Sequence, residues 1–212
     1  PPAPFEIDRV LDIERRQVIR CRVEPSDTSM NCDVLVVGGG LGGVAAAEAA
    51  ARAGLTVILT EPTRMLGGQL TSQLVPVPDE NAHIEKPNGP STRQWRALRQ
   101  TVRAHYAARP GVKPNFADNI GQCWVSRVSG TPDVWEKAIR ERLAPFVASG
   151  RIRHVLTRHQ IRQVGLYSGN GRFNWADLAD LDTGRVTRVA AKTMIDATED
   201  GAAMALAGMP LR

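Results

Sequence analysis

The chain has 212 residues, which is enough to bury one large core or two small ones. Its net charge of +5 comes mostly from arginine, and the sequence holds no dense basic cluster with interleaved aromatic residues, so its composition argues against a nucleic-acid-binding protein. No apolar run is long enough to span a membrane, and the three cysteines fit neither a disulfide framework nor a metal site.

Residues 1–31 are predicted to form an arm at the edge of the domain. Val, Ile, Cys and Arg alternate between Gln17 and Val23, which is typical of one strand or a hairpin, and we expect this arm to dock without contributing chemistry. The first residues, Pro1-Pro2-Ala3-Pro4, are typical of an exported chain that has lost a leader, and a shortened chain is the other interpretation. Of these two, we favour the exported chain. The expectation is therefore export to the periplasm or the cell exterior, with a cytoplasmic location as the alternative. A Cys21–Cys32 disulfide stays open in the exported case.

Residues 32–74 are predicted to form a βαβ core. Val34 to Val37 is a short apolar run, as expected for a strand that is buried on both faces. A G-x-G-x-x-G pattern follows within Gly38–Gly43, and an alanine-rich segment, Val44–Ala53, then indicates a helix. A second apolar run, Leu55–Leu59, leads to the acid Glu61. This order of strand, glycine turn, helix, strand and acid predicts a dinucleotide site, and the alternative is a glycine-rich turn without a ligand.

Each residue type of the motif serves a separate purpose in binding a dinucleotide. Gly38 permits the tight turn, Gly40 lets the backbone approach a pyrophosphate, and Gly43 lets the helix pack closely on the strand. The start of the helix offers unpaired N–H groups and a positive dipole end to the phosphates. Glu61 is expected to accept hydrogen bonds from an adenosine ribose.

The segment Thr63–Leu74 carries a second glycine pair, Gly67-Gly68, a few residues after this acid. Such a pair can bring backbone amides toward a second part of an extended dinucleotide. A nicotinamide site more often runs straight from the acid into a helix, so the pair favours FAD over NAD. The alternative is a loop without a ligand.

Residues 75–146 are predicted to be a mainly helical insertion with two candidates for chemistry. Glu80 lies in the loop after the expected flavin-contacting segment, where it is a candidate base, and the alternative is a surface acid. Cys123, at the start of a short apolar element, is a candidate covalent flavin link or redox partner, and the alternative is a small buried apolar residue. The histidines have no metal-ligand spacing and are interpreted as surface or helix residues, so no metal site is expected. They are His105, His154 and His159.

Residues 147–212 are predicted to supply the return strands of the same domain. The turn signal Asp182-Thr183-Gly184 predicts a β-hairpin of the strands on either side of it. The five strands are expected at Arg151–Leu156, Ile161–Leu166, Asn174–Leu181, Arg185–Val189 and Thr193–Ala197. The fold class is therefore α/β: a Rossmann-like FAD-binding domain with a parallel sheet, a β-meander hairpin and a helical insertion.

Four pieces of the sequence match a known family: VVGGGLGGVAAAEAAARAG, TRMLGGQLTSQ, GQCWVSR and IDATEDGAAMALAG. The chain resembles, from about Cys32 to its end, the FAD-dependent oxidoreductases with a glutathione-reductase-like flavin domain, and within them a mostly exported bacterial group. The resemblance implies that the Arg64–Thr71 loop runs beside the pyrophosphate, ribityl chain and flavin ring. It also implies that the backbone of His154–Leu156 meets the adenine and that Ala197–Gly201 closes over the adenosine diphosphate. The cofactor-binding residues expected from the motifs and the resemblance are Gly38, Gly40, Leu41, Gly42, Gly43, Glu61, Pro62, Arg64, Gly67, Gly68, Gln69, Leu70, Thr71, Val155, Ala197, Thr198 and Gly201.

Members of this family are typically longer, with a final segment that completes the flavin domain. The resemblance therefore implies either an N-terminal part or a chain that a second polypeptide completes. The expected function is to bind FAD non-covalently and to transfer a hydride to it from a small organic substrate. The alternative is a non-catalytic subunit of a larger complex, in which FAD is structural or absent.

Overall fold

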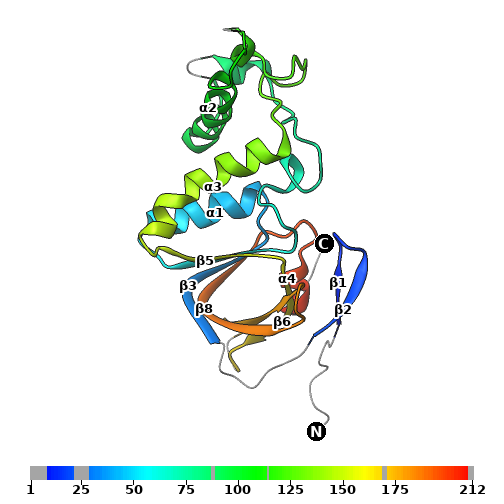
Figure 1. Ribbon diagram of the computed structural model, residues 1–212. Coiled ribbons are helices and arrows are strands. Elements are labelled where there is room, and N and C mark those ends of the chain that lie inside the picture. Colours follow the sequence, from blue (N-terminus) through cyan, green and yellow to red (C-terminus); the bar gives the residue numbers. More distant parts are fainter. Residues whose placement is uncertain (1–8, 22–28, 87–88, 114, 169–170, 210–212) are drawn as a thin grey trace. The chain divides into compact units, whose positions relative to one another are not determined.

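The computed structural model describes residues 9–21, 29–86, 89–113, 115–168 and 171–209 (Figure 1). The chain forms two compact units. The first, here called the sheet unit, comprises Pro1–Arg64 and Phe146–Arg212, and the second, the helical unit, comprises Met65–Pro145. The segment 65–74, which the sequence grouped with the βαβ core, therefore belongs to the helical unit. None of the helices in the described residues is both long and apolar enough to span a membrane.

The sheet unit is built around a six-stranded sheet with the order β5-β4-β3-β8-β7-β6. The first four strands in this order run parallel, and β7 and β6 complete an antiparallel meander with β8. The strands are β3 (Ser29–Val37), β4 (Val57–Glu61), β5 (Ile152–Thr157), β6 (His159–Leu166), β7 (Phe173–Asp180) and β8 (Val186–Asp196). The mixed α/β architecture with a mostly parallel sheet confirms the predicted fold class.

The strand β8 corrects one prediction. The sequence predicted two strands here, separated at Ala190–Lys192, but the structure has one strand of 11 residues. Alanine and lysine favour strands weakly, yet Ala190 and Ala191 pair with β3 on one side, and Ala190 also pairs with β7 on the other. The two ladders hold the backbone extended where local preference predicts a break.

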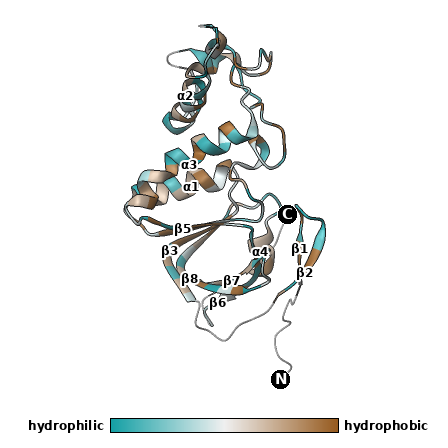
Figure 2. Cartoon of the chain, in the orientation of Figure 1, coloured by the Kyte–Doolittle hydropathy of each residue, from teal (hydrophilic) through white to brown (hydrophobic). Residues whose placement is uncertain are grey.

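The core of the sheet unit lies inside the curl of the sheet. Leu35 and Ile58 of the parallel strands pack in one buried cluster with Leu178 of the meander and Ala203 of the short helix α4 (Ala202–Leu206). Helix α1 (Leu41–Arg52) follows β3 and buries one face that includes Ala47. Figure 1 shows α4 within the curved sheet, and Figure 2 shows the apolar strands around it. This packing fixes the loops that follow β3, β4 and β8.

The N-terminal arm forms a separate two-stranded antiparallel hairpin of β1 (Arg9–Asp12) and β2 (Gln17–Arg20). Val10 on its inner face is 7% exposed and packs with Leu181 and Val186 of the meander. Leu11 and Val18 form a cross-strand pair that is exposed. The predicted pattern extended to Val23, which lies outside the described residues.

The helical unit contains α2 (Arg93–Ala107), most of α3 (Pro132–Ala148) and the 3-10 turns η1 (Gly68–Leu70), η2 (Ala82–Glu85) and η3 (Phe116–Asp118). The Thr92 hydroxyl caps α2 by accepting a hydrogen bond from Trp95 N–H at 3.1 Å. The rings of Trp95 and Trp135 stack with their centroids 5.8 Å apart and join the two helices. The apolar element predicted at Cys123–Ser126 is wrong, because these residues form turns and Trp124 is 94% exposed.

Candidate functional site

The carboxyl ends of β3, β4 and β8 meet at one edge of the sheet, where ligands bind in doubly wound α/β proteins. A cavity of about 180 Å³ lies at this edge. Its lining comes from the glycine turn, the end of β4, the start of β6, the loop between β8 and α4, and the turn of the N-terminal hairpin. Five segments that are distant in the sequence therefore share one cavity within the sheet unit.

The three glycines of the motif have different structural environments. Gly38 has a φ of +103°, and an added Cβ there would lie 2.3 Å from Ala197 O. A Cβ on Gly43 would lie 1.8 Å from Gly38 O. Gly40, in contrast, has an ordinary φ of −61°, and the nearest atom to its added Cβ is Glu199 Oε1 at 3.3 Å. The fold thus requires glycine at positions 38 and 43, whereas glycine at position 40 leaves space next to the cavity.

Helix α1 begins next to this space, because its N-cap residue Gly40 lines the cavity. No side chain caps the helix at Gly40, and its first turn contains no acidic residue. The N–H groups of the first turn therefore have no intrahelical partner, and the helix dipole is positive at this end. Such an end favours an anion such as a phosphate. The carboxylate oxygen Oε1 of Glu199, on the exposed loop after β8, is the atom nearest to a Cβ added at Gly40.

Glu61 at the end of β4 is 6% exposed, and its carboxylate is held by three donors. Its Oε2 accepts a hydrogen bond from Gly39 N–H at 2.8 Å. Its Oε1 accepts bonds from Thr63 N–H at 2.9 Å and from the Thr63 hydroxyl at 2.7 Å. Because a carboxylate oxygen accepts about two hydrogen bonds, Oε2 retains capacity for one further donor, such as a ribose hydroxyl.

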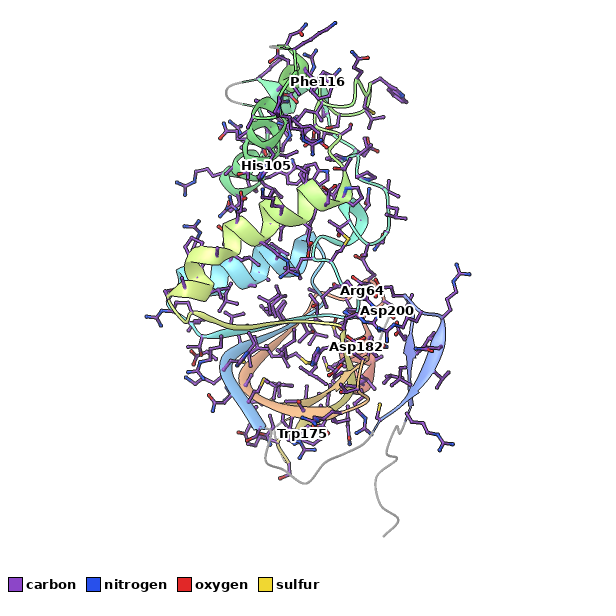
Figure 3. The ribbon with its side chains drawn as sticks, viewed as in Figure 1. Arg64, His105, Phe116, Trp175, Asp182 and Asp200 are labelled. Atoms are coloured by element: carbon purple, nitrogen blue, oxygen red, sulfur yellow. The ribbon has the colours of Figure 1, made fainter. Side chains whose placement is uncertain are left out.

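The loop after β8 is organised by Asp196, which the sequence analysis did not single out. Its Oδ1 accepts hydrogen bonds from the Thr198 N–H at 2.9 Å and from the Thr198 hydroxyl at 2.6 Å. Its Oδ2 accepts a bond from Met204 N–H at 2.8 Å in α4. The sheet also holds this loop, because Ala197 N–H donates to Val37 O at 2.7 Å. Ala197 and Thr198 thereby line the cavity, as do the exposed Glu199 and Asp200 that follow them. Asp200 is labelled in Figure 3.

Two buried polar atoms at the cavity have no hydrogen-bond partner among the residues that the structure describes. They are the hydroxyl oxygen of Thr60 and Oε1 of Gln160, and both residues line the cavity. Unpaired buried polar atoms are costly, so these two oxygen atoms are suited to accept hydrogen bonds from a ligand. A polar ligand with hydrogen-bond donors would satisfy them.

Of the predicted site residues, the ones that line this cavity are Gly38, Gly40, Pro62, Ala197 and Thr198. Neighbouring predicted residues that do not line it are Leu41, Gly42, Gly43, Glu61 and Gly201. Val155 is half-buried in β5, where it pairs with Leu59, and is not among the lining residues. Arg64 is mostly exposed, and its Nε lies 3.5 Å from Glu14 Oε2. The glycine-pair segment belongs to the helical unit, where it forms η1 and its end, and its contact with a cofactor stays a prediction. Its predicted residues are Gly67, Gly68, Gln69, Leu70 and Thr71.

Two residues that line the cavity were not predicted as site residues from the sequence. His159 was interpreted as a surface or helix histidine, but it begins β6, is half-buried and lines the cavity. Its Nδ1 lies 2.8 Å from Thr157 O across a tight connection. Ile13, from the arm to which no chemistry was assigned, also lines the cavity. Neither residue stands in a motif, so no local signal identified them.

Glu80 in the helical unit is not a surface acid, because its side chain is 6% exposed. Its Oε1 accepts a hydrogen bond from Trp95 Nε1 at 2.6 Å, and its Oε2 accepts one from the Ser126 hydroxyl at 2.7 Å. The guanidinium of Arg99 forms an ion pair with it at 3.1 Å. These contacts favour a structural role over the predicted role as a base.

Cys123 is half-buried, which does not match the alternative of a small buried apolar residue. Hydrogen bonds from the backbone N–H groups of Val125 and Ser126 lower the pKa of its thiol. A lowered pKa increases the thiolate fraction and with it the reactivity. Neither Cys21 nor Cys32 forms a disulfide bond within the part of the chain that the structure describes. Among the described residues, no group of acids, histidines and cysteines could hold a metal ion.

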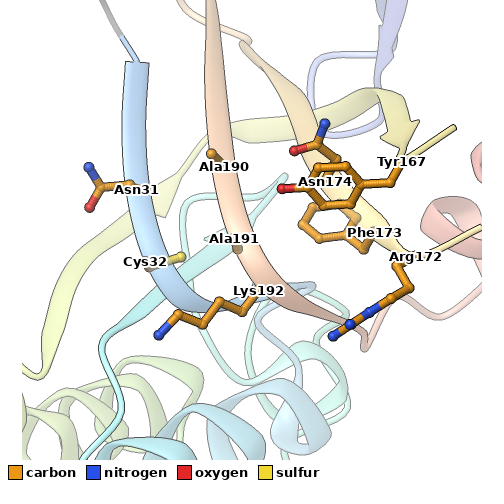
Figure 4. Close-up of a pocket in the computed structure, with 9 residues that line it drawn as sticks. All are labelled: Asn31, Cys32, Tyr167, Arg172, Phe173, Asn174, Ala190, Ala191 and Lys192. Atoms are coloured by element: carbon orange, nitrogen blue, oxygen red, sulfur yellow. The ribbon is translucent and has the colours of Figure 1, made fainter. Parts of the chain in front are cut away.

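A second, more open cavity of about 610 Å³ lies along the amino-terminal half of β3 (Figure 4). Cys32 lines it together with Tyr167, Phe173 and Lys192. The Lys192 ammonium is neutralised by Asp33 at 2.7 Å. This cavity is remote along β3 from the glycine turn, and it lacks a helix N-terminus or a motif residue. The smaller cavity is therefore the candidate functional site.

Comparison with known proteins identifies similarity over most of the chain. The family described as FAD dependent oxidoreductase matches residues 33–212. The flavin-dependent monooxygenase PieE, solved with FAD and substrate, is 18% identical, with 88% of this chain and 33% of that chain covered and a TM-score of 0.50. Sdh1 of Mycobacterium smegmatis in complex with UQ1 is 16% identical, with 81% and 34% covered and a TM-score of 0.49. A geranylgeranyl bacteriochlorophyll reductase-like protein of Thermoplasma acidophilum is 20% identical, with 85% and 43% covered and a TM-score of 0.49. The chain thus spans less than half the length of these proteins.

Proposed function

The chain belongs to the FAD dependent oxidoreductase family, and on this basis we propose that its sheet unit binds the adenosine diphosphate end of FAD at the glycine-turn cavity. The observation that carries the proposal is the space at Gly40, next to the uncapped N-terminus of α1. The fold tolerates a side chain at this position, so its absence is explained by a ligand that approaches the backbone. The same space receives unpaired N–H groups suited to a pyrophosphate.

The residues at and beside the cavity fit this group in hydrogen bonding. The first turn of α1 would hold the phosphates, and the free acceptor capacity of Glu61 Oε2 would hold one ribose hydroxyl. Thr60 and Gln160 offer the unpaired oxygen atoms described above. Pro62 contributes an apolar surface beside them. These side chains are consistent with an adenosine diphosphate moiety and would fix its orientation.

Bound FAD would supply the capacity to accept a hydride from a small organic substrate. The residues at the cavity would bind and orient the nucleotide. The carboxylate of Glu199 opposes phosphate binding by like-charge repulsion, unless it turns away on its exposed loop. We propose that binding moves this side chain away from Gly40.

We further propose that the substrate-binding part is supplied by residues outside this chain or by a second polypeptide. The exposed Met204 and Met209, on α4 and just after it, support an apolar contact close to the cavity residue Ala202. Native mass spectrometry of the purified protein tests this proposal. A complex with one additional polypeptide supports it, and a monomer that oxidises substrate unaided contradicts it.

A spectroscopic titration tests the proposed cofactor. We expect FAD to bind with one molecule per chain and FMN, which lacks the adenosine monophosphate part, to bind at least about tenfold more weakly. Equal affinities for FAD and FMN would contradict a site built around the adenosine diphosphate. A panel of organic donors then separates an enzyme from a subunit with structural FAD, because only the enzyme bleaches the flavin absorbance near its visible maximum upon addition of its substrate.

A further inference from the structure

The turn of the N-terminal hairpin reaches the candidate nucleotide cavity. Ile13, the first residue after β1, lines this cavity together with Gly38, Pro62 and His159. Its side chain is 63% exposed, so most of its apolar surface is available to a ligand. The hairpin precedes the segment that the family match covers, which begins at residue 33. It therefore lies outside the segment on which the family match rests.

The hairpin is fixed to the sheet unit by close packing. Val10 on its inner face is buried against Leu181 and Val186. On the other strand, Arg20 O lies so near Gly184 that an added Cβ would be 2.4 Å from it. Gly184 also has a φ of +73°, so a tight turn with glycine is required where the backbones approach. The hairpin is thus a fixed part of the unit.

The guanidinium of Arg158 ties the hairpin turn to the end of β4. Arg158 has a φ of +61° in the short connection between β5 and β6, and its side chain is 5% exposed. Its Nη1 donates to Asp12 Oδ1 at 2.9 Å and to Pro62 O at 3.4 Å, and its Nη2 donates to Asp12 Oδ2. Its backbone N–H donates to Thr63 O at 3.0 Å. One residue therefore sets the position of Ile13, which follows Asp12, relative to Pro62.

Further ion pairs strengthen this connection. The Arg158 Nη1 lies 2.9 Å from Glu14 Oε2, and its Nε lies 3.3 Å from Asp182 Oδ1. Asp182, labelled in Figure 3, also pairs with Arg15 of the hairpin turn at 2.6 Å. The net gain in stability from these ion pairs is small, because charged groups lose hydration when they are buried, and an apolar contact in their place would stabilise the fold equally well. A bidentate pair, however, fixes orientation as well as distance.

We propose that the N-terminal hairpin is a wall of the nucleotide site, in which Ile13 contacts the bound adenine nucleotide and Arg158 acts as a positioning residue. Ile13 and Pro62 present apolar surfaces, and His159 adds a planar ring, which together suit the flat face of a base. The hairpin thereby contributes affinity for adenine nucleotides that the glycine turn alone does not supply. This inference rests on the proposed binding of FAD at the same cavity.

Two alanine variants of the hairpin test the contact with Ile13. Val18 is a matched control, because it is 61% exposed on the same hairpin and does not line the cavity. Isothermal titration with FAD and with ADP should show that Ile13→Ala weakens both ligands by about five- to tenfold, since part of an isoleucine side chain is no longer buried on binding. Val18→Ala should leave both affinities unchanged, and the thermal unfolding of the two variants should be alike.

A double-mutant cycle tests the positioning role. Arg158→Lys keeps the buried charge but loses the two parallel hydrogen bonds to Asp12. If Arg158 acts through Ile13, Arg158→Lys should weaken ADP binding, and Ile13→Ala added to it should cause little further loss. Additive losses would show that Arg158 does not act through Ile13 and would overturn its positioning role.

The outcomes separate the two proposals. If the wild-type chain binds neither FAD nor ADP, the proposed function itself fails. If the wild type binds both and Ile13→Ala binds them as tightly as Val18→Ala, only the role of the hairpin is overturned.

Discussion

Replacing Gly40 by alanine separates ligand binding from folding at the glycine turn. The backbone φ of −61° accepts any residue, and the added Cβ would meet only the end of the flexible Glu199 side chain, at 3.3 Å. Alanine stabilises the fold by reducing the conformational freedom of the unfolded chain, and it destabilises the fold because it is a poorer N-cap residue than glycine. These two effects nearly offset each other, so the free energy of unfolding should change by less than about 1 kcal/mol. The methyl group would nevertheless occupy the space in front of the α1 N-terminus.

The expected loss of affinity follows from the hydrogen bonds that a phosphate would make there. A hydrogen bond to a charged group contributes about 1.5–3 kcal/mol. Losing the equivalent of two such hydrogen bonds should weaken the binding of FAD by about 3 kcal/mol or more, which is a roughly hundredfold higher dissociation constant. Fluorescence titration with FAD measures this change, and urea unfolding of the same preparation measures stability.

Gly38→Ala is the control with the opposite behaviour. Its left-handed φ of +103° and the 2.3 Å approach of Ala197 O should lower the free energy of unfolding by about 3 kcal/mol. A Gly40→Ala protein that is stable and binds FAD with unchanged affinity would refute the assignment of the pyrophosphate to this turn.

Three further predictions concern single side chains. The hydrogen bonds from Arg158 lower the pKa of Asp12 from 3.8 to about 2, so this contribution to stability is complete above about pH 4 and is lost as the pH falls toward about 2. Asp12→Asn should therefore flatten the pH dependence of urea unfolding over this range, and an unchanged profile would count against the ion pair. Glu199→Gln removes a negative charge next to the α1 N-terminus and should strengthen ADP binding by about two- to fivefold at low salt. This gain should decrease at high salt, because salt screens the charge. Weaker ADP binding in calorimetry would instead show that the carboxylate helps to hold the ligand. Backbone hydrogen bonds lower the pKa of Cys123, whereas burial raises that of Cys32 to about 11, so iodoacetamide at neutral pH should label Cys123 at least about tenfold faster by peptide mass spectrometry. Equal labelling of the two thiols would contradict the difference in their environments.

The βαβ core was predictable because its signals are local. A buried apolar run, a glycine turn and an alanine-rich helix lie within Asp33–Pro62, and the structure places β3, α1 and β4 there. The reasons for glycine at positions 38 and 43 also follow from this order, since the turn and the helix must approach each other closely. The helical insertion and the meander hairpin were similarly indicated by their periodicity and turn residues.

The remainder of the site depends on contacts that no local pattern encodes. His159 reaches the cavity because the sheet curls and brings the start of β6 beside the glycine turn. Ile13 reaches it because Arg158 binds Asp12, a pair separated by 146 residues. The burial of Glu80 likewise requires side chains from separate segments of the helical unit. Export stays a prediction, since it rests on the first residues and on the resemblance to a mostly exported group.

Competition between ADP and FAD tests the central claim most directly. ADP contains the groups assigned to the glycine turn and Glu61, and it lacks the flavin. Calorimetric titration of the wild-type chain should show one ADP site, and ADP should displace bound FAD with the same dissociation constant that it shows alone. ADP that binds without displacing FAD, or that does not bind at millimolar concentration, would contradict the claim that this cavity holds the adenosine diphosphate end of the cofactor.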